Sequence, residues 1–354
     1  FSALSFFTDT PELRLFGDGN TWQSIVGASV LLWVVHFLVL RGVQTAAGIN
    51  LVATLAKLLP LGAFVALAAL AFQLDTFRLD FSGLALGVPV WEQVKNTMLI
   101  TLWVFIGVEG AVVVSARARH KRDVGRATLL AVLSALAVYL LVTLLSLGVV
   151  PRSELAEMRN PSMAGLMVRL MGSWGEIVIA AGLIVSVCGA YLSWTIMAAE
   201  VPFLAATHKA FPRLFARQNS NNAPSASLWL TNISVQVSLV LIWLTGSDYG
   251  TLLTIASEMI LVPYLLVGAF LLKIATRPLH KAVAIGACIY GIWLLYASGP
   301  VHLLLSVVLY APGLLVFLYA RRTHQHDRSL KRREVALIGL LLVAAVPATW
   351  MLVG

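Results

Sequence analysis

The feature that most constrains this chain is a succession of apolar runs, each about twenty residues long and separated by short polar clusters. A run of that length, folded as an α-helix with a rise of about 1.5 Å per residue, crosses a hydrocarbon layer about 30 Å thick. Only 12% of the residues are charged and 59% are hydrophobic, whereas soluble domains carry about 25% charged residues. The sequence therefore predicts an all-α polytopic membrane protein and excludes an ordinary soluble enzyme.

Ten membrane spans are expected, and none alternates polar and apolar residues in the way a transmembrane β-strand does. Each can satisfy its backbone hydrogen bonds within one helix, as the bilayer interior requires. The spans cover roughly residues 22–40, 49–72, 97–115, 127–149, 177–199, 228–244, 249–272, 283–297, 301–320 and 335–353.

Most of the 25 lysine and arginine residues lie in alternate connections between these spans, notably in the segments 117–126 and 321–333. Such basic connections remain in the cytoplasm. Membrane topology therefore explains the net charge of +9, and no nucleic-acid partner is implied.

The sequence shows no chemistry of the kinds that drive hydrolysis or metal catalysis. Cys188 and Cys288 lie within apolar runs, which implies no disulfide framework. We find no phosphate-binding loop, no nucleophile motif and no metal-spaced cluster of Cys and His. No cofactor or metal is therefore predicted, and the chain is not expected to be an enzyme.

Ionisable residues at membrane depth are costly and are usually retained for a pathway or a site. Three stand out, Lys57, Glu109 and Glu258. Glycines at positions 107 and 110 bracket Glu109, and each lowers helix propensity by about 1 kcal/mol relative to alanine. The sequence predicts an interrupted helix there, of the kind that builds midplane substrate sites in secondary transporters. For each charge, a snorkelling side chain or an interhelical pair is the alternative.

Two tryptophans add candidates for holding a cation. Trp103 lies six residues before Glu109, and a tryptophan face can hold a desolvated cation with about 2 kcal/mol. An interfacial belt position is the alternative for Trp103, and helix packing is the alternative for Trp194. Lys57 and Glu258 lie near the helix breakers Pro60 and Pro263. A desolvated lysine can act as a proton carrier or take the place of a bound sodium ion.

Four segments together resemble the bacterial basic amino-acid antiporters of the amino acid-polyamine-organocation superfamily, in particular the arginine/ornithine antiporter group. The segments are residues 102–109 (LWVFIGVE), the loop 117–128, residues 211–219 (FPRLFARQN) followed by Ala223-Pro224, and residues 261–264 (LVPY). Their order and spacing extend across nearly the whole chain.

The resemblance implies a five-helix inverted-repeat, LeuT-like transporter fold. On this basis residues 1–73 are the remainder of the first repeat, residues 74–273 are the second repeat, and residues 274–354 are C-terminal accessory helices. By the same resemblance residues 22–40 correspond to helix four of the family, so we expect this chain, which begins with Phe1, to lack the N-terminal helices, including the break that holds the substrate carboxylate.

The resemblance also implies roles for single residues. Trp103 matches the tryptophan that packs on the substrate side chain and acts as a gate, and Ile106, beside Gly107, lies where a freed carbonyl receives the substrate ammonium. Glu109 matches the acid tied to proton sensing and outer gating. The remaining site candidates are its gate neighbour Tyr264, the aromatic wall Trp194, the helix-five lysine Lys57, and Glu258, whose acid would suit a cationic head group.

The expected function is secondary antiport of cationic amino acids, arginine for ornithine, by alternating access in the bacterial inner membrane. Lysine/cadaverine exchange, arginine/agmatine exchange and a non-transporting fragment of such a carrier are the alternatives. A channel is less consistent with broken helices and an aromatic gate. The expected partners are small cationic amino acids and the lipid bilayer, and the resemblance suggests a homodimer.

Overall fold

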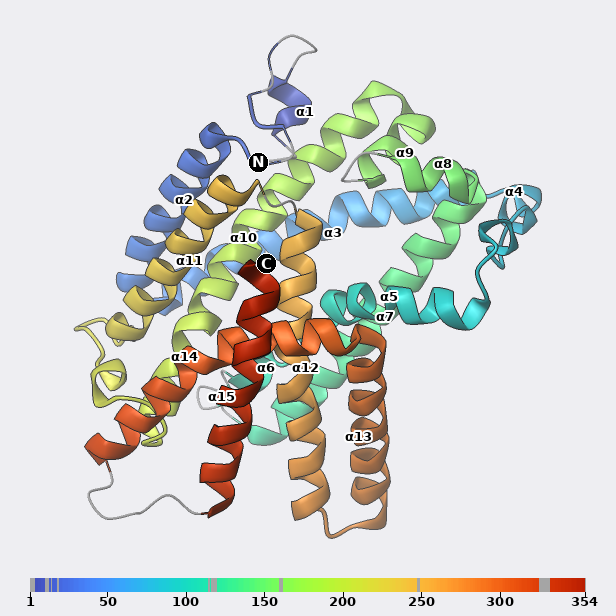
Figure 1. Ribbon diagram of the computed structural model, residues 1–354. Helices are drawn as coiled ribbons and strands as arrows, with labels where there is room; N and C mark the ends of the chain where they lie inside the picture. Colours follow the sequence, from blue (N-terminus) through green and yellow to red (C-terminus); the bar gives the residue numbers. More distant parts are fainter. Residues whose placement is uncertain are drawn as a thin grey trace. The chain divides into compact units, whose positions relative to one another are not determined.

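The structure is a computed structural model that describes residues 4–9, 13, 15–17, 19–113, 115, 120–158, 162–246, 249–324 and 332–353. Within some helices only the backbone is described, which includes the position of Lys57. All regular elements in these ranges are helices (Figure 1).

Each expected span overlaps a helix, but only six helices in the described ranges are long and apolar enough to cross a membrane. These six are α2 (Trp22–Leu40), α7 (Lys121–Val149), α10 (Ser173–Thr207), α11 (Ser225–Thr245), α12 (Tyr249–Ile274) and α13 (Pro278–Ser298). The other expected spans coincide with α3 (Val43–Leu70), the pair α5 (Val90–Phe105) and α6 (Gly110–Val113), α14 (Pro300–His324) and α15 (Arg332–Val353). A polytopic membrane protein is thus supported, whereas the count of ten spans stays a prediction.

Short helices outside the apolar runs were not expected. They are α1 (Ser5–Thr8), α4 (Leu74–Arg78), α8 (Arg152–Glu157), α9 (Ser162–Met171) and two 3-10 turns, η1 (Leu84–Leu86) and η3 (Arg213–Ala216). Hydropathy over about twenty residues cannot detect elements this short. Apart from α1, which precedes α2, they belong to the connections between the long helices.

The chain divides into two compact units. The first comprises Phe1–Val88, Gly107–Leu204 and Leu214–Asp248, and the second comprises Pro89–Ile106, Ala205–Arg213 and Tyr249–Gly354. The helix interruption at residues 106–109 coincides with one boundary between the units.

In the first unit, α2 and α11 run side by side and are joined by a polar ladder (Figure 1). The His36 ring is fully buried, and its Nδ1 lies 2.8 Å from the Asn232 side-chain nitrogen. The Trp33 indole N–H donates to the Gln236 side chain at 3.1 Å, and Gln236 donates to the Ser29 hydroxyl at 2.9 Å. Such interhelical bonds help fix the pairing of two apolar helices.

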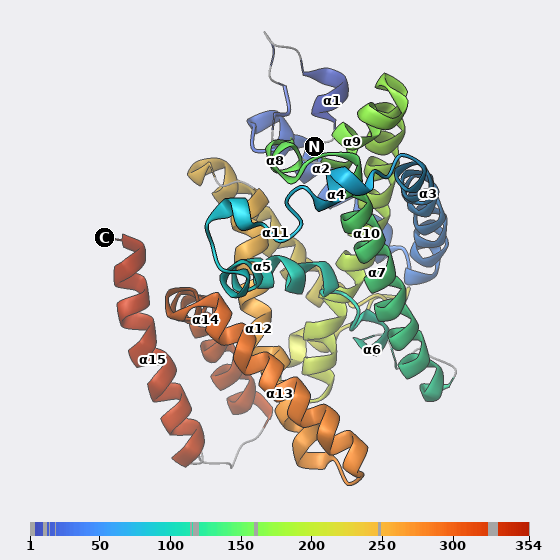
Figure 2. The same ribbon diagram turned by 90° about the vertical axis from the view of Figure 1, so that its right-hand side faces the viewer.

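The second unit is built around α5, α12 and α13. Leu102, Leu261 and Leu294, one from each of these helices, form its buried cluster. The same unit contains α14, which contacts α12 and α13 (Figure 2), and α15, which is tied to α14 by an ion pair of 2.9 Å between Arg321 and Glu334. Helix α5 thus belongs to a packed group of helices, although it is connected at its C-terminal end to residues of the first unit.

Candidate functional site

The predicted helix interruption is present. Helix α5 ends at Phe105, and Ile106 adopts an extended conformation with φ −61° and ψ 131°. Gly107 follows with φ +107°, a conformation that only glycine adopts readily. A new turn of helix begins at Gly110, whose N–H donates to the Gly107 carbonyl at 3.0 Å. The backbone between Phe105 and Gly110 therefore departs from regular helix, as the two glycines predicted.

Glu109 folds back onto this interruption. Its carboxylate oxygen Oε2 accepts a hydrogen bond of 2.9 Å from the Gly107 N–H. Its own carbonyl accepts from Val112 and Val113, at 2.8 Å and 3.1 Å, and so starts α6. A hydrogen bond to a charged acceptor is stronger than one to a neutral group. The carboxylate thus stabilises the interrupted backbone and also places negative charge beside it.

Helix α10 packs against both glycines of the interruption. A Cβ atom at Gly107 would lie 2.9 Å from Cζ2 of Trp194, and a Cβ atom at Gly110 would lie 2.8 Å from Sδ of Met197. Trp194 and Met197 are three residues apart, so they share one face of the helix. Trp194 nevertheless remains 42% exposed, and it therefore both packs on the backbone and presents part of its indole.

Met197 was not predicted as part of this region. Its sulfur fills the space beside Gly110 in the way that a flexible thioether fills irregular gaps. The helical spacing from Trp194 is the one signal in the sequence that could have identified it. The first unit therefore brings together Gly107, Glu109, Trp194 and Met197.

Trp103, Ile106, Glu258 and Tyr264 lie in the second unit. Trp103 is in the last turn of α5, and its carbonyl accepts from the Ile106 N–H at 3.1 Å. Tyr264 packs against the cluster that contains Leu102. The Glu258 side chain is only 6% exposed, which is unusual for a carboxyl group.

Helix α12 is held to α5 one residue before Glu258. The hydroxyl of Ser257, which is fully buried, donates to the carbonyl of Leu99 at 3.1 Å. Leu99 is one helical turn before Trp103. The structure therefore brings the backbone that carries Glu258 close to the helix that carries Trp103.

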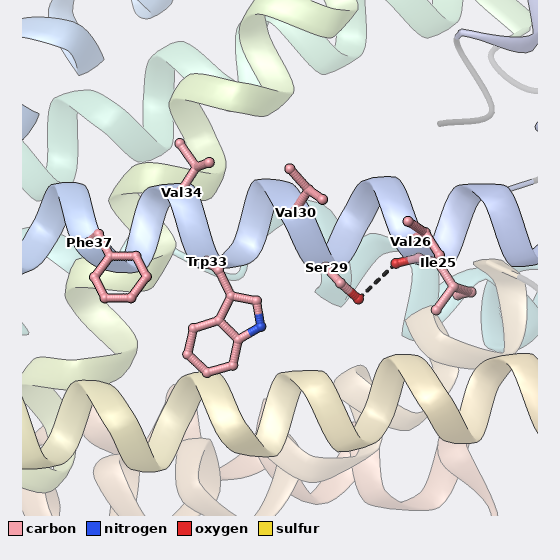
Figure 3. A pocket seen from close by; sticks show the side chains of 7 residues that line it. All are labelled: Ile25, Val26, Ser29, Val30, Trp33, Val34 and Phe37. Carbon is pink, nitrogen blue, oxygen red and sulfur yellow. Dashed lines mark hydrogen bonds between the residues drawn. The ribbon is translucent and has the colours of Figure 1, made fainter.

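Lys57 and an apolar groove along α2 add no described side chain to the candidate site. Lys57 lies on α3, but its side chain is outside the described part of the structure. An open apolar groove of about 470 Å³ follows α2, where the Trp33 indole points toward α11 (Figure 3). The groove is lined by Ile25, Val26, Ser29, Val30, Trp33, Val34 and Phe37 and includes none of the predicted site residues. Within the described ranges, no three acidic, cysteine or histidine residues are grouped to hold a metal ion.

Comparison with known proteins identifies relatives along the whole chain. Residues 1–341 match the amino acid permease family. An Escherichia coli K12 protein named "Putative arginine/ornithine antiporter" is 87% identical over 354 residues, which are 100% of this chain and 77% of the relative.

More distant relatives have similar names. An arginine/ornithine antiporter of Pseudomonas aeruginosa is 43% identical over 91% of this chain and 70% of its own length. An arginine/agmatine antiporter of Chlamydia caviae is 38% identical over 95% of this chain and 73% of its own length. Both the family match and the coverage of these relatives extend over most of the sequence. The chain therefore belongs to the amino acid permease family.

Proposed function

We propose that this protein is a secondary antiporter of the bacterial inner membrane that exchanges cationic amino acids, with arginine and ornithine as the pair. The observation that carries the proposal is the interrupted helix at residues 106–109, where Glu109 is bonded to the Gly107 N–H. Interrupted helices expose backbone groups to a polar ligand at membrane depth, and the carboxylate favours a positive one. The names of the relatives indicate the same class of substrate.

The proposed roles of single residues follow from their chemistry. The carbonyl of Ile106, in its extended backbone, receives the substrate ammonium beside Gly107. The indoles of Trp103 and Trp194 contact the aliphatic part or the guanidinium of the substrate, since the face of an indole ring can hold a cation. Glu109 couples the site to protons.

Three further residues have supporting roles in this proposal. Glu258, a buried acid on α12, complements the cationic head group of the substrate. Tyr264 assists gating, and Lys57 supplies a positive charge in place of a sodium ion. Ionisable groups at membrane depth are costly and are usually retained for a pathway or a site.

We also propose the LeuT-like architecture for this chain, with residues 1–73 and 74–273 in the two inverted repeats, residues 274–354 as accessory helices, and a homodimer as the assembly. Alternating access would then result from motion of one repeat against the other. The long apolar helices and the family membership support this proposal.

The proposal is tested with purified protein in proteoliposomes that are preloaded with ornithine. Uptake of labelled arginine is expected to require internal ornithine and to stop when the vesicles are empty. Uptake at the same rate into empty vesicles would exclude exchange and would leave uniport or channel activity. Leucine inside the vesicles serves as the neutral control and should not support uptake.

The relatives named for arginine and agmatine give a second candidate pair. The same vesicles, preloaded in turn with agmatine, lysine or cadaverine, rank the counter-substrates. Faster arginine uptake into agmatine-loaded vesicles than into ornithine-loaded vesicles would favour arginine/agmatine exchange. Uptake of labelled lysine into cadaverine-loaded vesicles that is faster than either would favour lysine/cadaverine exchange.

A further inference from the structure

Helix α12 contains a proline in its interior, Pro263. Proline has no backbone N–H, so the carbonyl four residues earlier in a helix loses its usual donor. In α12 that carbonyl belongs to Met259. A backbone carbonyl left without a donor in hydrocarbon would cost several kcal/mol, and the helix would also be easier to bend at this turn.

A tyrosine from another helix provides a donor for this carbonyl. The hydroxyl of Tyr310, on α14, donates to the Met259 carbonyl at 2.6 Å. This distance is typical of a strong O–H···O hydrogen bond. Both residues belong to the second unit, and both side chains are half-buried. The phenol thus replaces the hydrogen bond that Pro263 removes.

The turn held in this way carries a candidate substrate residue. Glu258 immediately precedes Met259 and is buried. On its other side the Ser257 hydroxyl donates to the Leu99 carbonyl of α5. Two hydrogen bonds to different helices therefore flank the Glu258 position. Ser257 donates to α5, and Met259 accepts from α14. A bend at Pro263 would break the second bond and change the direction of the carboxylate.

We infer that Tyr310 is a positioning residue of the carrier: its hydroxyl holds the proline-weakened turn of α12 and thereby fixes the place of Glu258. The inference rests on the proposed function in that Glu258 complements the cationic substrate. Tyr310 itself contacts the backbone and acts on the substrate only through Glu258.

The decisive experiment is a cycle of two substitutions. Tyr310→Phe removes only the hydroxyl, and Pro263→Ala restores an N–H that can donate to the Met259 carbonyl. With the wild-type proline at position 263, we expect Tyr310→Phe to raise the KM for arginine exchange roughly three- to tenfold, which corresponds to the loss of one hydrogen bond. The maximal rate should change less. In the Pro263→Ala background, the same substitution should have little effect, because the hydroxyl is then redundant.

A matched control is Tyr319→Phe, which removes the hydroxyl of an exposed tyrosine on the same helix and should leave the KM unchanged. A purely structural role would lower the amount of folded protein at constant KM. The inference is overturned if Tyr310→Phe leaves the KM unchanged, or if its effect is equally large with Ala at position 263.

Hydrogen–deuterium exchange of the α12 segment 257–265 separates this inference from the proposed function. Tyr310→Phe should accelerate exchange in this segment roughly three- to tenfold, and Pro263→Ala should abolish the difference. Suppose that the variants show these differences in hydrogen–deuterium exchange but the wild-type protein does not transport arginine against ornithine. The substrate proposal then fails, and the role of Tyr310 in holding α12 stands. If hydrogen–deuterium exchange of the segment 257–265 is the same in the wild-type protein and in Tyr310→Phe, the role of Tyr310 is excluded even when arginine transport is observed.

Discussion

The indole of Trp194 lies against the backbone of Gly107, and it leaves no space for a side chain there. A Cβ at this position would be 2.9 Å from Cζ2 and 3.4 Å from Cη2 of the indole. Gly107 also has φ +107°, where L-residues are strained. Two independent restrictions, one steric and one conformational, therefore require glycine at the helix interruption.

Gly107→Ala is accordingly expected to destabilise the protein by about 1–3 kcal/mol and to abolish arginine exchange. Thermal unfolding in detergent and uptake by proteoliposomes measure the two effects. Gly286→Ala on α13 is the matched control, because a Cβ there meets nothing within 4 Å, and it should be tolerated. Adding Trp194→Leu to Gly107→Ala relieves the steric conflict and leaves the strain, so only part of the stability should return. Normal transport by Gly107→Ala alone would contradict the geometry.

Glu109 has two separable functions, as an acceptor for the Gly107 N–H and as a negative charge. Glu109→Gln retains an acceptor oxygen, so we expect normal folding with an altered pH dependence of arginine uptake. Glu109→Ala removes both functions and should also destabilise the interruption, by about 1.5–3 kcal/mol for a bond to a charged group. Glu92→Gln, an exposed acid in the first turn of α5, is the control. An uptake profile in Glu109→Gln that matches the wild-type profile at every pH would exclude Glu109 from the proton-linked role.

The sequence was sufficient to predict the long helices and the place where one is interrupted. Their apolar length is a local property, and so is the effect of glycines on both sides of an acid. For α2 even the limits agree, since Thr21 before Trp22 caps the helix with its side chain. The division of the chain into two compact units, by contrast, depends on contacts that no local pattern encodes.

Pairing between distant helices was not predicted for the same reason. The bond from Gln236 to Ser29 joins residues 207 positions apart, and each side chain alone looks like an isolated polar residue in an apolar run. The expectation that Pro60 and Pro263 act as helix breakers was wrong, because α3 and α12 continue through them. Tyr310 as the donor that supports the turn before Pro263 could not be predicted. Local composition indicates where a backbone needs help, and only tertiary packing shows which side chain provides it.

For the buried pair of His36 and Asn232, we expect a single substitution to lower the stability of the protein more than a double substitution. Asn232→Ala leaves the fully buried imidazole without the 2.8 Å contact at Nδ1, and we expect a loss of about 1 kcal/mol in stability. His36→Phe combined with Asn232→Leu removes both polar groups and should cost less than Asn232→Ala, because no donor or acceptor is left unpaired.

Thermal unfolding in detergent compares these variants. Ser238→Ala, which alters an exposed residue of the same helix, is the control and should be neutral. A double variant less stable than Asn232→Ala would show that packing around the ring, including the Trp229 indole with its centroid at 4.3 Å, matters more than the polar pair.

An ion pair in the connections between long helices gives a prediction for acidic pH. Arg152 Nε donates to Asp80 Oδ2 at 2.8 Å, and a second guanidinium nitrogen contacts the same oxygen. The hydrogen bonds from Arg152, followed by the backbone N–H of Ala85, lower the pKa of Asp80 below its ordinary value of 3.8. Because the pKa is lower in the folded protein, the pair stabilises the fold above pH 3.8, and this contribution is lost as the pH falls through the lowered value.

The pair should therefore remain intact across the mildly acidic range. Hydrogen–deuterium exchange of residues 80–88 and 152–157 in the wild-type protein is compared with Asp80→Asn at each pH, which cancels the intrinsic pH dependence of exchange. Asp80→Asn should exchange faster at pH values of about 5 and above, and the difference should vanish only below pH 3.8, the ordinary pKa of this carboxyl group. Asp75→Asn, at an exposed acid of α4, should match the wild-type protein throughout. If the difference between wild-type and Asp80→Asn already disappeared near pH 5, the pKa of Asp80 would have to be raised, and Arg152 could not be its stabilising partner.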